Sequence, residues 1–144
     1  MKFDLEKSLG FIVQRTALKM KNELNRVFKP YGITPEQWGL LNYLWQKDGI
    51  AQKELSNKSY KDQPSVTRLL DKLEEKGLII RRLNPRDRRE LLVFLSYRGR
   101  ELKDELVPLA AGYLQKMQQG MSEKDLDLLK LLLTKVYINL DNKL

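Results

Sequence analysis

The densest group of chemically capable side chains in this sequence is a run of arginines. Five arginines fall within residues 81–89, and Asn84, Pro85 and a single acid, Asp87, lie among them. Such a density of like charge is self-repelling, but arginine binds phosphate through two parallel hydrogen bonds and fits a narrow minor groove of DNA. The run therefore indicates a turn that meets an external polyanion, while a solvated run of surface charge is the plainer alternative.

Within this run we expect one residue to shape the turn and the others to reach outward. Asp87 is expected to pair with a neighbouring arginine, such as Arg89, and so to hold the turn in shape. Arg86 and Arg88 then reach outward. These two residues and Arg89 are the candidate contacts to DNA in the turn.

A second group of polar residues precedes the arginines at helical spacing. The apolar residues there follow an i, i+3, i+4, i+7 pattern, which predicts the buried face of a helix: Val66, Leu69, Leu70 and Leu73. Six of the other positions hold residue types that can contact DNA, namely Gln63, Pro64, Ser65, Thr67, Arg68 and Lys72.

Each of these residue types has a specific use against DNA. Arg68 can bind guanine O6 and N7 as a fork, and Thr67 can contact a thymine methyl group or a phosphate. Ser65 or Gln63, near the helix start, can donate hydrogen bonds to base edges, and Pro64 helps to fix that start. An ordinary exposed helix with polar residues is the alternative, because the spacing alone is undemanding.

The elements around these residues are predicted from hydrophobic spacing and from capping residues. In chain order we expect a long helix up to about residue 28, a helix capped by Thr34, a two-turn helix over 52–58, a helix capped by Asp62 that ends at Gly77, a β-hairpin of 78–82 and 91–95 around a polar turn at 84–89, and two helices capped by Ser96 and Ser122. A short helix, a turn, a second helix and a basic hairpin in this order are typical of a winged helix-turn-helix.

Composition narrows the function further. Lysine and arginine outnumber aspartate and glutamate by 27 to 19, and residues 58–103 carry +6 of the net charge of +8. Charge concentrated in one segment favours a surface that faces a polyanion. The sequence contains no cysteine and no histidine, which supply many of the nucleophiles, general bases and zinc ligands of enzymes. We therefore expect no enzymatic activity, no metal site and no cofactor.

We also expect a cytoplasmic protein that is not bound to a membrane. The N-terminal residues include acidic side chains and lead into no uninterrupted apolar stretch of the signal-peptide type. The most apolar later run, 126–140, is interrupted by Asp127, Lys130 and Lys135 and is too short to span a bilayer.

Three segments together resemble the sequence signature of the MarR family of bacterial transcriptional regulators. Residues 66–79 read VTRLLDKLEEKGLI, residues 85–89 read PRDRR, and residues 95–99 read LSYRG, with Arg82 between the first two. The coarse order of the elements is similar over almost the whole chain. This wing pattern, combined with long helices at both ends, is rare among other winged helices.

The resemblance implies a homodimer whose first helix and last two helices interlock, with two wings spread over a pseudo-palindromic operator. The apolar last helix supports this independently because it needs a partner surface, although folding back on the monomer's own core is the alternative. A two-fold dimer would place its two recognition helices about one turn of DNA apart, roughly 34 Å.

Family members commonly bind small aromatic or phenolic ligands in a cleft between the dimerisation helices and the DNA-binding lobe. By this implication, the candidate ligand contacts are Phe11, Arg15, Trp38 and Tyr43, which combine apolar walls with one cation suited to a carboxylate. Packing in the core is the default alternative for the aromatic residues. Without cysteine or histidine, peroxide sensing by a thiol and zinc sensing by imidazole are both excluded.

We therefore predict a mainly α fold with a small β-hairpin wing, in a single domain over residues 1–144. A winged helix-turn-helix lobe is expected over 34–96, and dimerisation helices over 1–30 and 97–144. The predicted function is that of a homodimeric, sequence-specific DNA-binding transcriptional regulator, expected to be a repressor and to be released by a small-molecule ligand if it has one. The alternatives are an architectural protein that binds DNA without sequence preference and a winged helix used for protein contacts.

Overall fold

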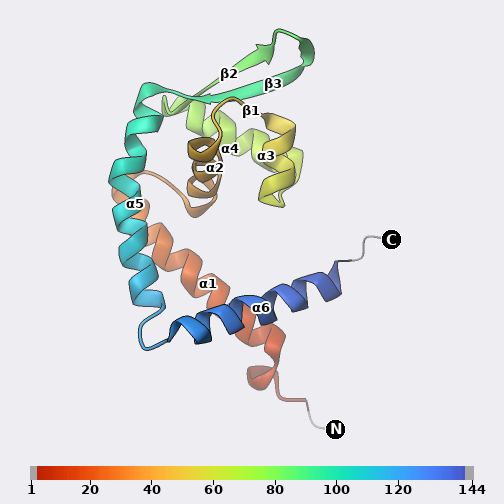
Figure 1. The fold of residues 1–144 in the computed structure, drawn as a ribbon, viewed down its shortest axis with the longest axis vertical. Helices are drawn as coiled ribbons and strands as arrows, with labels where there is room; N and C mark the ends of the chain where they lie inside the picture. The colour runs from red at the N-terminus through yellow and green to blue at the C-terminus, as the bar shows by residue number, and fades with distance from the viewer. Residues whose placement is uncertain (1–2, 142–144) are drawn as a thin grey trace. The chain divides into compact units, whose positions relative to one another are not determined.

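The computed structural model describes residues 3–141. By its internal contacts the chain divides into two compact units, Met1–Ala110 and Ala111–Leu144. The ends of the two expected dimerisation segments, residues 1–2 and 142–144, lie outside the described residues. In Figure 1 the elements are labelled in chain order.

Helices dominate the described chain, and three short strands form one sheet. The elements are η1 (Leu5–Lys7), α1 (Leu9–Phe28), η2 (Lys29–Tyr31), α2 (Pro35–Gln46), β1 (Ile50–Ala51), α3 (Gln52–Ser59), α4 (Gln63–Glu75), β2 (Ile79–Asn84), β3 (Asp87–Leu95), α5 (Tyr97–Met117) and α6 (Glu123–Leu140). The mainly α fold with a hairpin wing is confirmed.

Local capping chemistry sets the helix starts, as the sequence predicts. The Thr34 hydroxyl accepts a hydrogen bond from the Gln37 backbone N–H, and the Gln37 side chain accepts one from the Thr34 N–H. This reciprocal capping box satisfies two backbone donors that the first turn of a helix leaves open. Ser122 and Asp125 form the same arrangement at the start of α6.

The sheet differs from the prediction in two ways. Strand β1 was not predicted, and it pairs antiparallel with β3, so that the strand order is β1-β3-β2. The polar turn expected over 84–89 was too long, because β3 already begins at Asp87, opposite Asn84. Polar residues can extend a hairpin whose outer end has no core to face, so polarity alone overestimates a turn. In Figure 1 this hairpin projects beyond the helices α3 and α4.

The first unit is held together by one hydrophobic core. Its buried members come from α1, α2, α3, α4, the sheet, α5 and the connections between them. The largest are Phe28, Ile33, Leu40, Leu41, Leu44, Ile50, Leu55, Leu70, Leu73 and Leu106. Three of the four positions expected to form the inner face of α4, Val66, Leu70 and Leu73, are fully buried, and Leu69 is half-buried against them. The opposite side of α4 is therefore directed to solvent.

The start of α5 is fixed tightly against the base of the hairpin. The Ser96 hydroxyl accepts a hydrogen bond from the Gly99 N–H at 3.0 Å and donates one to the Gly77 carbonyl at 2.6 Å. The Trp45 indole N–H donates to the Gly99 carbonyl at 3.0 Å. A Cβ atom at Gly99 would overlap the Leu78 carbonyl oxygen, so this approach requires glycine.

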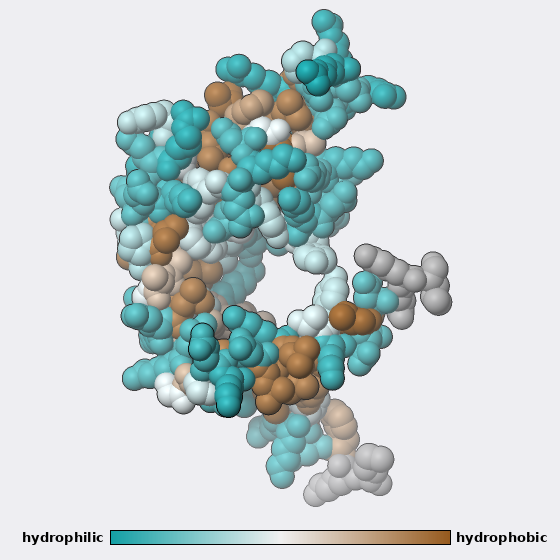
Figure 2. All heavy atoms as spheres, viewed as in Figure 1, coloured by the Kyte–Doolittle hydropathy of each residue, from teal (hydrophilic) through white to brown (hydrophobic). Residues whose placement is uncertain are grey.

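Helix α6, in the second unit, carries many large apolar side chains that stay exposed on the single chain. They are Leu128, Leu129, Leu131, Leu132, Leu133, Tyr137, Ile138 and Leu140. Figure 2 shows hydrophobic residues gathered on the visible face of this helix. Among the described residues, no helix is long and apolar enough to cross a membrane.

Candidate nucleic-acid interface

The start of α4 presents most of the predicted DNA contacts to solvent. Asp62 caps the helix by accepting a hydrogen bond from the Ser65 backbone N–H at 2.7 Å, and Pro64 occupies the first turn. That backbone hydrogen bond is the main cause that lowers the pKa of Asp62 below its ordinary value. Gln63 and Pro64 are exposed, and they lie at the helix end that carries a partial positive charge.

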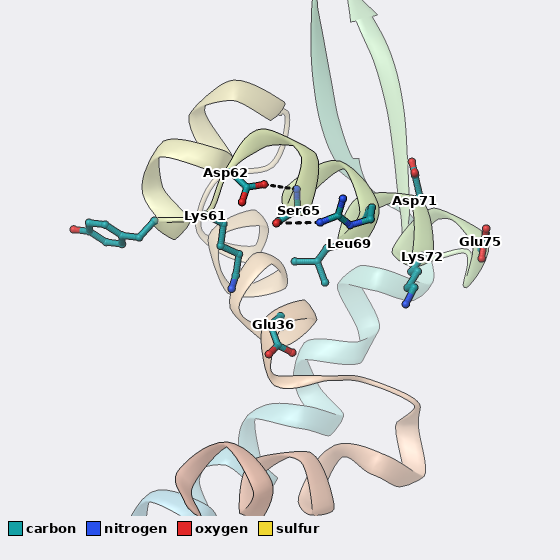
Figure 3. Close-up of a pocket in the computed structure, with 10 residues that line it drawn as sticks. Glu36, Lys61, Asp62, Ser65, Leu69, Asp71, Lys72 and Glu75 are labelled. Atoms are coloured by element: carbon teal, nitrogen blue, oxygen red, sulfur yellow. Dashed lines mark hydrogen bonds between the residues drawn. The ribbon is translucent and has the colours of Figure 1, made fainter. Parts of the chain in front are cut away.

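Arg68 and Lys72 lie along the same exposed side of α4. The Arg68 guanidinium donates to the Ser65 hydroxyl at 3.3 Å, a weak contact that leaves the side chain exposed. Figure 3 shows this side of the helix, where Lys61, Ser65 and Lys72 line a surface hollow of about 690 Å³. The hollow also contains carboxylates of Glu36, Asp62, Asp71 and Glu75, so its charge is mixed.

The Thr67 hydroxyl has two partners inside the protein. It donates to the Gln63 carbonyl at 2.9 Å and accepts from the Gln52 amide at 2.9 Å. The second bond joins α4 to the start of α3. These bonds leave the Thr67 methyl group as the part of the side chain suited to a thymine methyl. Sequence reasoning missed the role of Gln52, because nothing local relates two residues 15 positions apart.

In the wing, the pair expected of Asp87 is present. Asp87 Oδ1 accepts hydrogen bonds from the backbone N–H and the guanidinium Nε of Arg89, both at 3.1 Å. The hydrogen bond from the Arg89 side chain is the main cause that lowers the pKa of Asp87 below its ordinary value. Arg86, Arg88 and Arg89 are all exposed. The wing therefore presents three cations around a turn that one carboxylate helps to shape.

Arg81, by contrast, does not point to an external partner. Its guanidinium lies 2.6 Å from Asp71 and 2.6 Å from Glu74, both on α4, and its side chain is only 16% exposed. The interpretation of the arginine run as a turn that meets a polyanion therefore does not extend to Arg81, which lies on β2. Asp71 and Glu74 lie three residues apart on one helix, so a single fork can bind both.

Residues of β3 and the start of α4 also line a second hollow. It has a volume of about 750 Å³ and is lined by residues of α3 and β3, together with Ala51 of β1 and Gln63 at the start of α4. Asp87 and Arg89 lie on the β3 side of this hollow. The fold thus brings Gln63 close to wing residues that follow it by more than twenty positions.

The four candidate ligand residues fall into separate surroundings. The Arg15 guanidinium lies over the Phe11 ring, 5.7 Å from its centre, on α1. Trp38 packs between Phe28 and Trp45, with ring centres 4.8 and 5.5 Å away. Its surroundings favour the alternative of core packing.

Tyr43 is the candidate that lines a pocket. Its hydroxyl donates to the Lys58 carbonyl at 2.8 Å, and the adjoining pocket of about 260 Å³ is lined by Lys21, Glu36 and Lys61, among others. The other three candidates are not among its lining residues. A ligand role for Phe11, Arg15 and Trp38 stays a prediction.

An ion pair joins two walls of this pocket. Lys21 of α1 lies 2.8 Å from Glu36 at the start of α2. Burial raises the pKa of Glu36, but the hydrogen bond and charge of Lys21 outweigh it, so the pKa lies below its ordinary value. Sequence reasoning missed Lys21, Glu36 and Lys61 because they come from three different parts of the chain.

Comparisons with known proteins show which family and which characterised regulators this chain resembles. A model of the MarR family matches residues 33–91. The HTH-type transcriptional regulator MhqR of Bacillus subtilis (strain 168) is 29% identical over 136 residues, which cover 93% of this chain and 94% of that protein. The organic hydroperoxide resistance transcriptional regulator of the same strain is 30% identical over 132 residues, which cover 90% and 88%.

Solved structures are similar to this chain in both sequence and fold. A mutant MarR from E. coli, complexed with operator DNA, is 29% identical with a TM-score of 0.84, and the match covers 89% of this chain and 92% of that one.

Proposed function

Because this chain belongs to the MarR family of transcriptional regulators, it is a regulator rather than an enzyme, and we propose that it represses transcription by binding a pseudo-palindromic operator as a homodimer. The observation that carries this proposal is the pairing of two exposed groups on one lobe. Gln63 and Arg68 lie on the solvent side of α4, and Arg86, Arg88 and Arg89 lie on the projecting wing.

These two groups have complementary tasks on DNA. A helix whose capped N-terminus enters the major groove can read base edges, for which the Arg68 fork suits guanine. The wing arginines suit the phosphates and the narrow minor groove beside it. The similarity to the E. coli MarR mutant, which is complexed with operator DNA, supports operator binding here.

The exposed apolar surfaces of α1 and α6 support the dimer. On α1, Leu9, Ile12 and Val13 are exposed large apolar residues, and α6 carries the longer set described above. Apolar surface of this extent on a single chain is typical of a protein-protein interface. In a two-fold dimer these helices would join two lobes, each reading one half of the operator.

Release by a small ligand is the regulatory part of the proposal. The pocket beside Tyr43 supports it, because an aromatic ring and the cations Lys21 and Lys61 suit an aromatic carboxylate. A carboxylate that binds Lys21 would compete with Glu36 for the same ammonium group. Such a ligand would thereby alter the contact between α1 and α2.

The proposed function is tested by fluorescence anisotropy with two duplexes, one from the gene's own upstream region and one of scrambled sequence, at several salt concentrations. We expect the native duplex to bind about a thousandfold more tightly, with a steep salt dependence. Equal binding of both duplexes would instead support an architectural protein.

Two variants separate the roles of helix and wing. Arg68→Ala should cost about 1–3 kcal/mol on the operator and relax the base preference, whereas Arg88→Ala should weaken all sequences alike and lower the salt slope by about one. Lys103→Ala removes the same charge from the exposed side of α5 and serves as the control. Equal effects of Arg68→Ala and Arg88→Ala on base preference and salt slope would contradict the assigned roles.

A further inference from the structure

The side chain of Lys76 joins the C-terminal end of α4 to the turn that precedes α2. Its ammonium group donates hydrogen bonds to the Gly32 carbonyl and to Gln37 Oε1, the second at 3.0 Å. Lys76 is the C-cap residue of α4, and the two acceptors lie 44 and 39 positions earlier in the chain. This contact therefore binds α4 to the segment that connects α1 with α2.

The local fold holds both acceptors in place. Gln37 is only 1% exposed, and its Oε1 also accepts the Thr34 N–H in the capping box of α2. Gly32 ends η2 with a φ of 66°, a conformation that glycine adopts at little cost. Burial lowers the pKa of Lys76 below its ordinary value, so its ammonium group has exchanged part of its water for these oxygen atoms. A partly desolvated cation depends on the acceptors that replace its water.

The first turn of α2 is also bound from a second side. Glu36, which precedes Gln37, pairs with Lys21 of α1 at 2.8 Å. Glu36 lines both the pocket beside Tyr43 and the hollow along α4, and Figure 3 shows it at the start of α2. Two consecutive residues of one helical turn are thus bound, one to α1 and the other to α4. A shift of this turn at Glu36 would therefore also move the acceptor of Lys76.

We propose that Lys76 is a positioning residue, which sets the orientation of α4 from the first turn of α2 and so makes operator binding depend on the Lys21–Glu36 ion pair. This inference rests on the proposed function. Lys76 lies at the opposite end of α4 from Gln63, about 20 Å along the helix axis, and acts through its internal acceptors instead of touching DNA. A carboxylate that took Lys21 from Glu36 would then weaken operator binding through the same turn.

A double-mutant cycle, measured by anisotropy on the operator and scrambled duplexes, tests this role. Lys76→Met and Lys21→Met each remove an ammonium group and keep most of the apolar side chain. Each should raise the operator Kd about fivefold and change the scrambled Kd less than about twofold, because a misplaced α4 loses base contacts first. Together they should still raise the operator Kd about fivefold, whereas independent sites would give about 25-fold.

Three further variants serve as controls. Lys103→Met removes the same group from the exposed side of α5; it should leave the operator Kd unchanged and add nothing to the effect of Lys21→Met. Lys76→Arg should keep the wild-type Kd, because a guanidinium can donate to both oxygen atoms. Lys76→Gln, with a shorter side chain, should behave like Lys76→Met and provides a second variant. Thermal unfolding sets a temperature at which every variant is folded.

The salt slope separates positioning from a direct contact with DNA. Lys76→Met should keep the slope of the wild type, unlike Arg88→Ala, because no phosphate contact is lost. A lower slope with equal losses on both duplexes would show that Lys76 binds phosphate, and this would refute the positioning role.

The remaining contrary results also have separate meanings. Wild-type protein that binds no duplex would overturn the proposed function. Wild-type protein that binds the operator, with folded Lys76→Met and Lys76→Gln variants that bind it equally well, would overturn only the role of Lys76. A double variant in which the two effects multiply would show that Lys76 and Lys21 act independently, and would refute the dependence on the ion pair.

Discussion

The guanidinium group of Arg81 lies 2.6 Å from carboxylates on two successive turns of α4, whereas the side chain of Arg89, eight residues later, is 92% exposed on the wing. The two arginines have the same chemistry and lie in the same strand pair. Their surroundings give one of them a structural role and leave the other accessible to an external anion. Neighbours in space, which the sequence does not reveal, therefore decide what each arginine of this run does.

Gly99 provides a test at the scale of single atoms. Gly99→Ala should destabilise the protein by about 1–3 kcal/mol, because the new methyl group would overlap the Leu78 carbonyl oxygen. Urea denaturation followed by circular dichroism measures this change. Gly112→Ala is the matched control in the same helix; a Cβ atom added there would meet nothing within 4 Å, so it should stabilise the protein by about 0.5–1 kcal/mol. Equal effects of the two variants would refute the packing argument.

Individual residue roles could be predicted where the interaction is local. The pairing of Asp87 with Arg89 spans two residues and is confirmed. The bond between Gln52 and Thr67 and the ion pairs of Arg81 depend on how helices and strands pack, so the sequence alone did not reveal them. The DNA contacts assigned to Gln63, Ser65, Thr67, Arg68 and Lys72 stay predictions.

Helix α4 shows how one capping residue positions a whole element. Asp62 accepts a hydrogen bond from the Ser65 N–H, and this hydrogen bond lowers the pKa of the carboxyl group below its ordinary value. A group whose pKa is lower in the folded than in the unfolded state stabilises the fold above its unfolded pKa. That stabilisation is lost as the pH falls through the folded pKa.

Because the pKa of Asp62 is lowered in the folded state, the effect of removing this cap should depend on pH. Asp62→Ala should lower the unfolding temperature at neutral pH, and the difference from the wild type should shrink once the pH falls below the unfolded pKa of about 3.9. Thermal unfolding across this range measures it. Asp62→Asn, which retains a hydrogen-bond acceptor without the charge, should stay closer to the wild type at neutral pH. A difference between Asp62→Ala and the wild type that is constant at all pH values would exclude the charged cap.

Among the elements, helices were predicted better than strands. The starts at Thr34, Asp62 and Ser122 are confirmed, because capping depends on residues only three positions apart. Strand β1 has only two residues, Ile50–Ala51, and gives no periodic signal of its own. It exists because β3 offers a free edge, which is a property of the folded sheet.

At the scale of the whole molecule, the exposed leucines of α6 carry the clearest prediction. The double variant Leu132→Ala and Leu133→Ala should produce monomers, because these side chains, 48% and 42% exposed on the single chain, are proposed to pack against a second copy. Operator affinity should fall by about a hundredfold or more, since the two half-sites would no longer be bound together. Light scattering after size-exclusion chromatography measures the mass.

The control for this variant lies on the same helix. Lys130→Ala and Lys135→Ala together remove two exposed side chains of α6 without loss of apolar surface. They should leave the dimer intact. An undisturbed dimer in the double leucine variant would refute the placement of the interface. The single-domain organisation and the extent of the dimerisation segments stay predictions.

The ion pairs of Arg81 also bear on operator architecture. Arg81 joins β2 to Asp71 and Glu74 of α4, and Thr67 joins α4 to Gln52 of α3. These contacts hold the hairpin and both helices of the helix-turn-helix in fixed positions relative to one another. We therefore expect each protomer to recognise a half-site of constant length, in which a single inserted base pair abolishes binding. Natural operators of this protein would then share one half-site length.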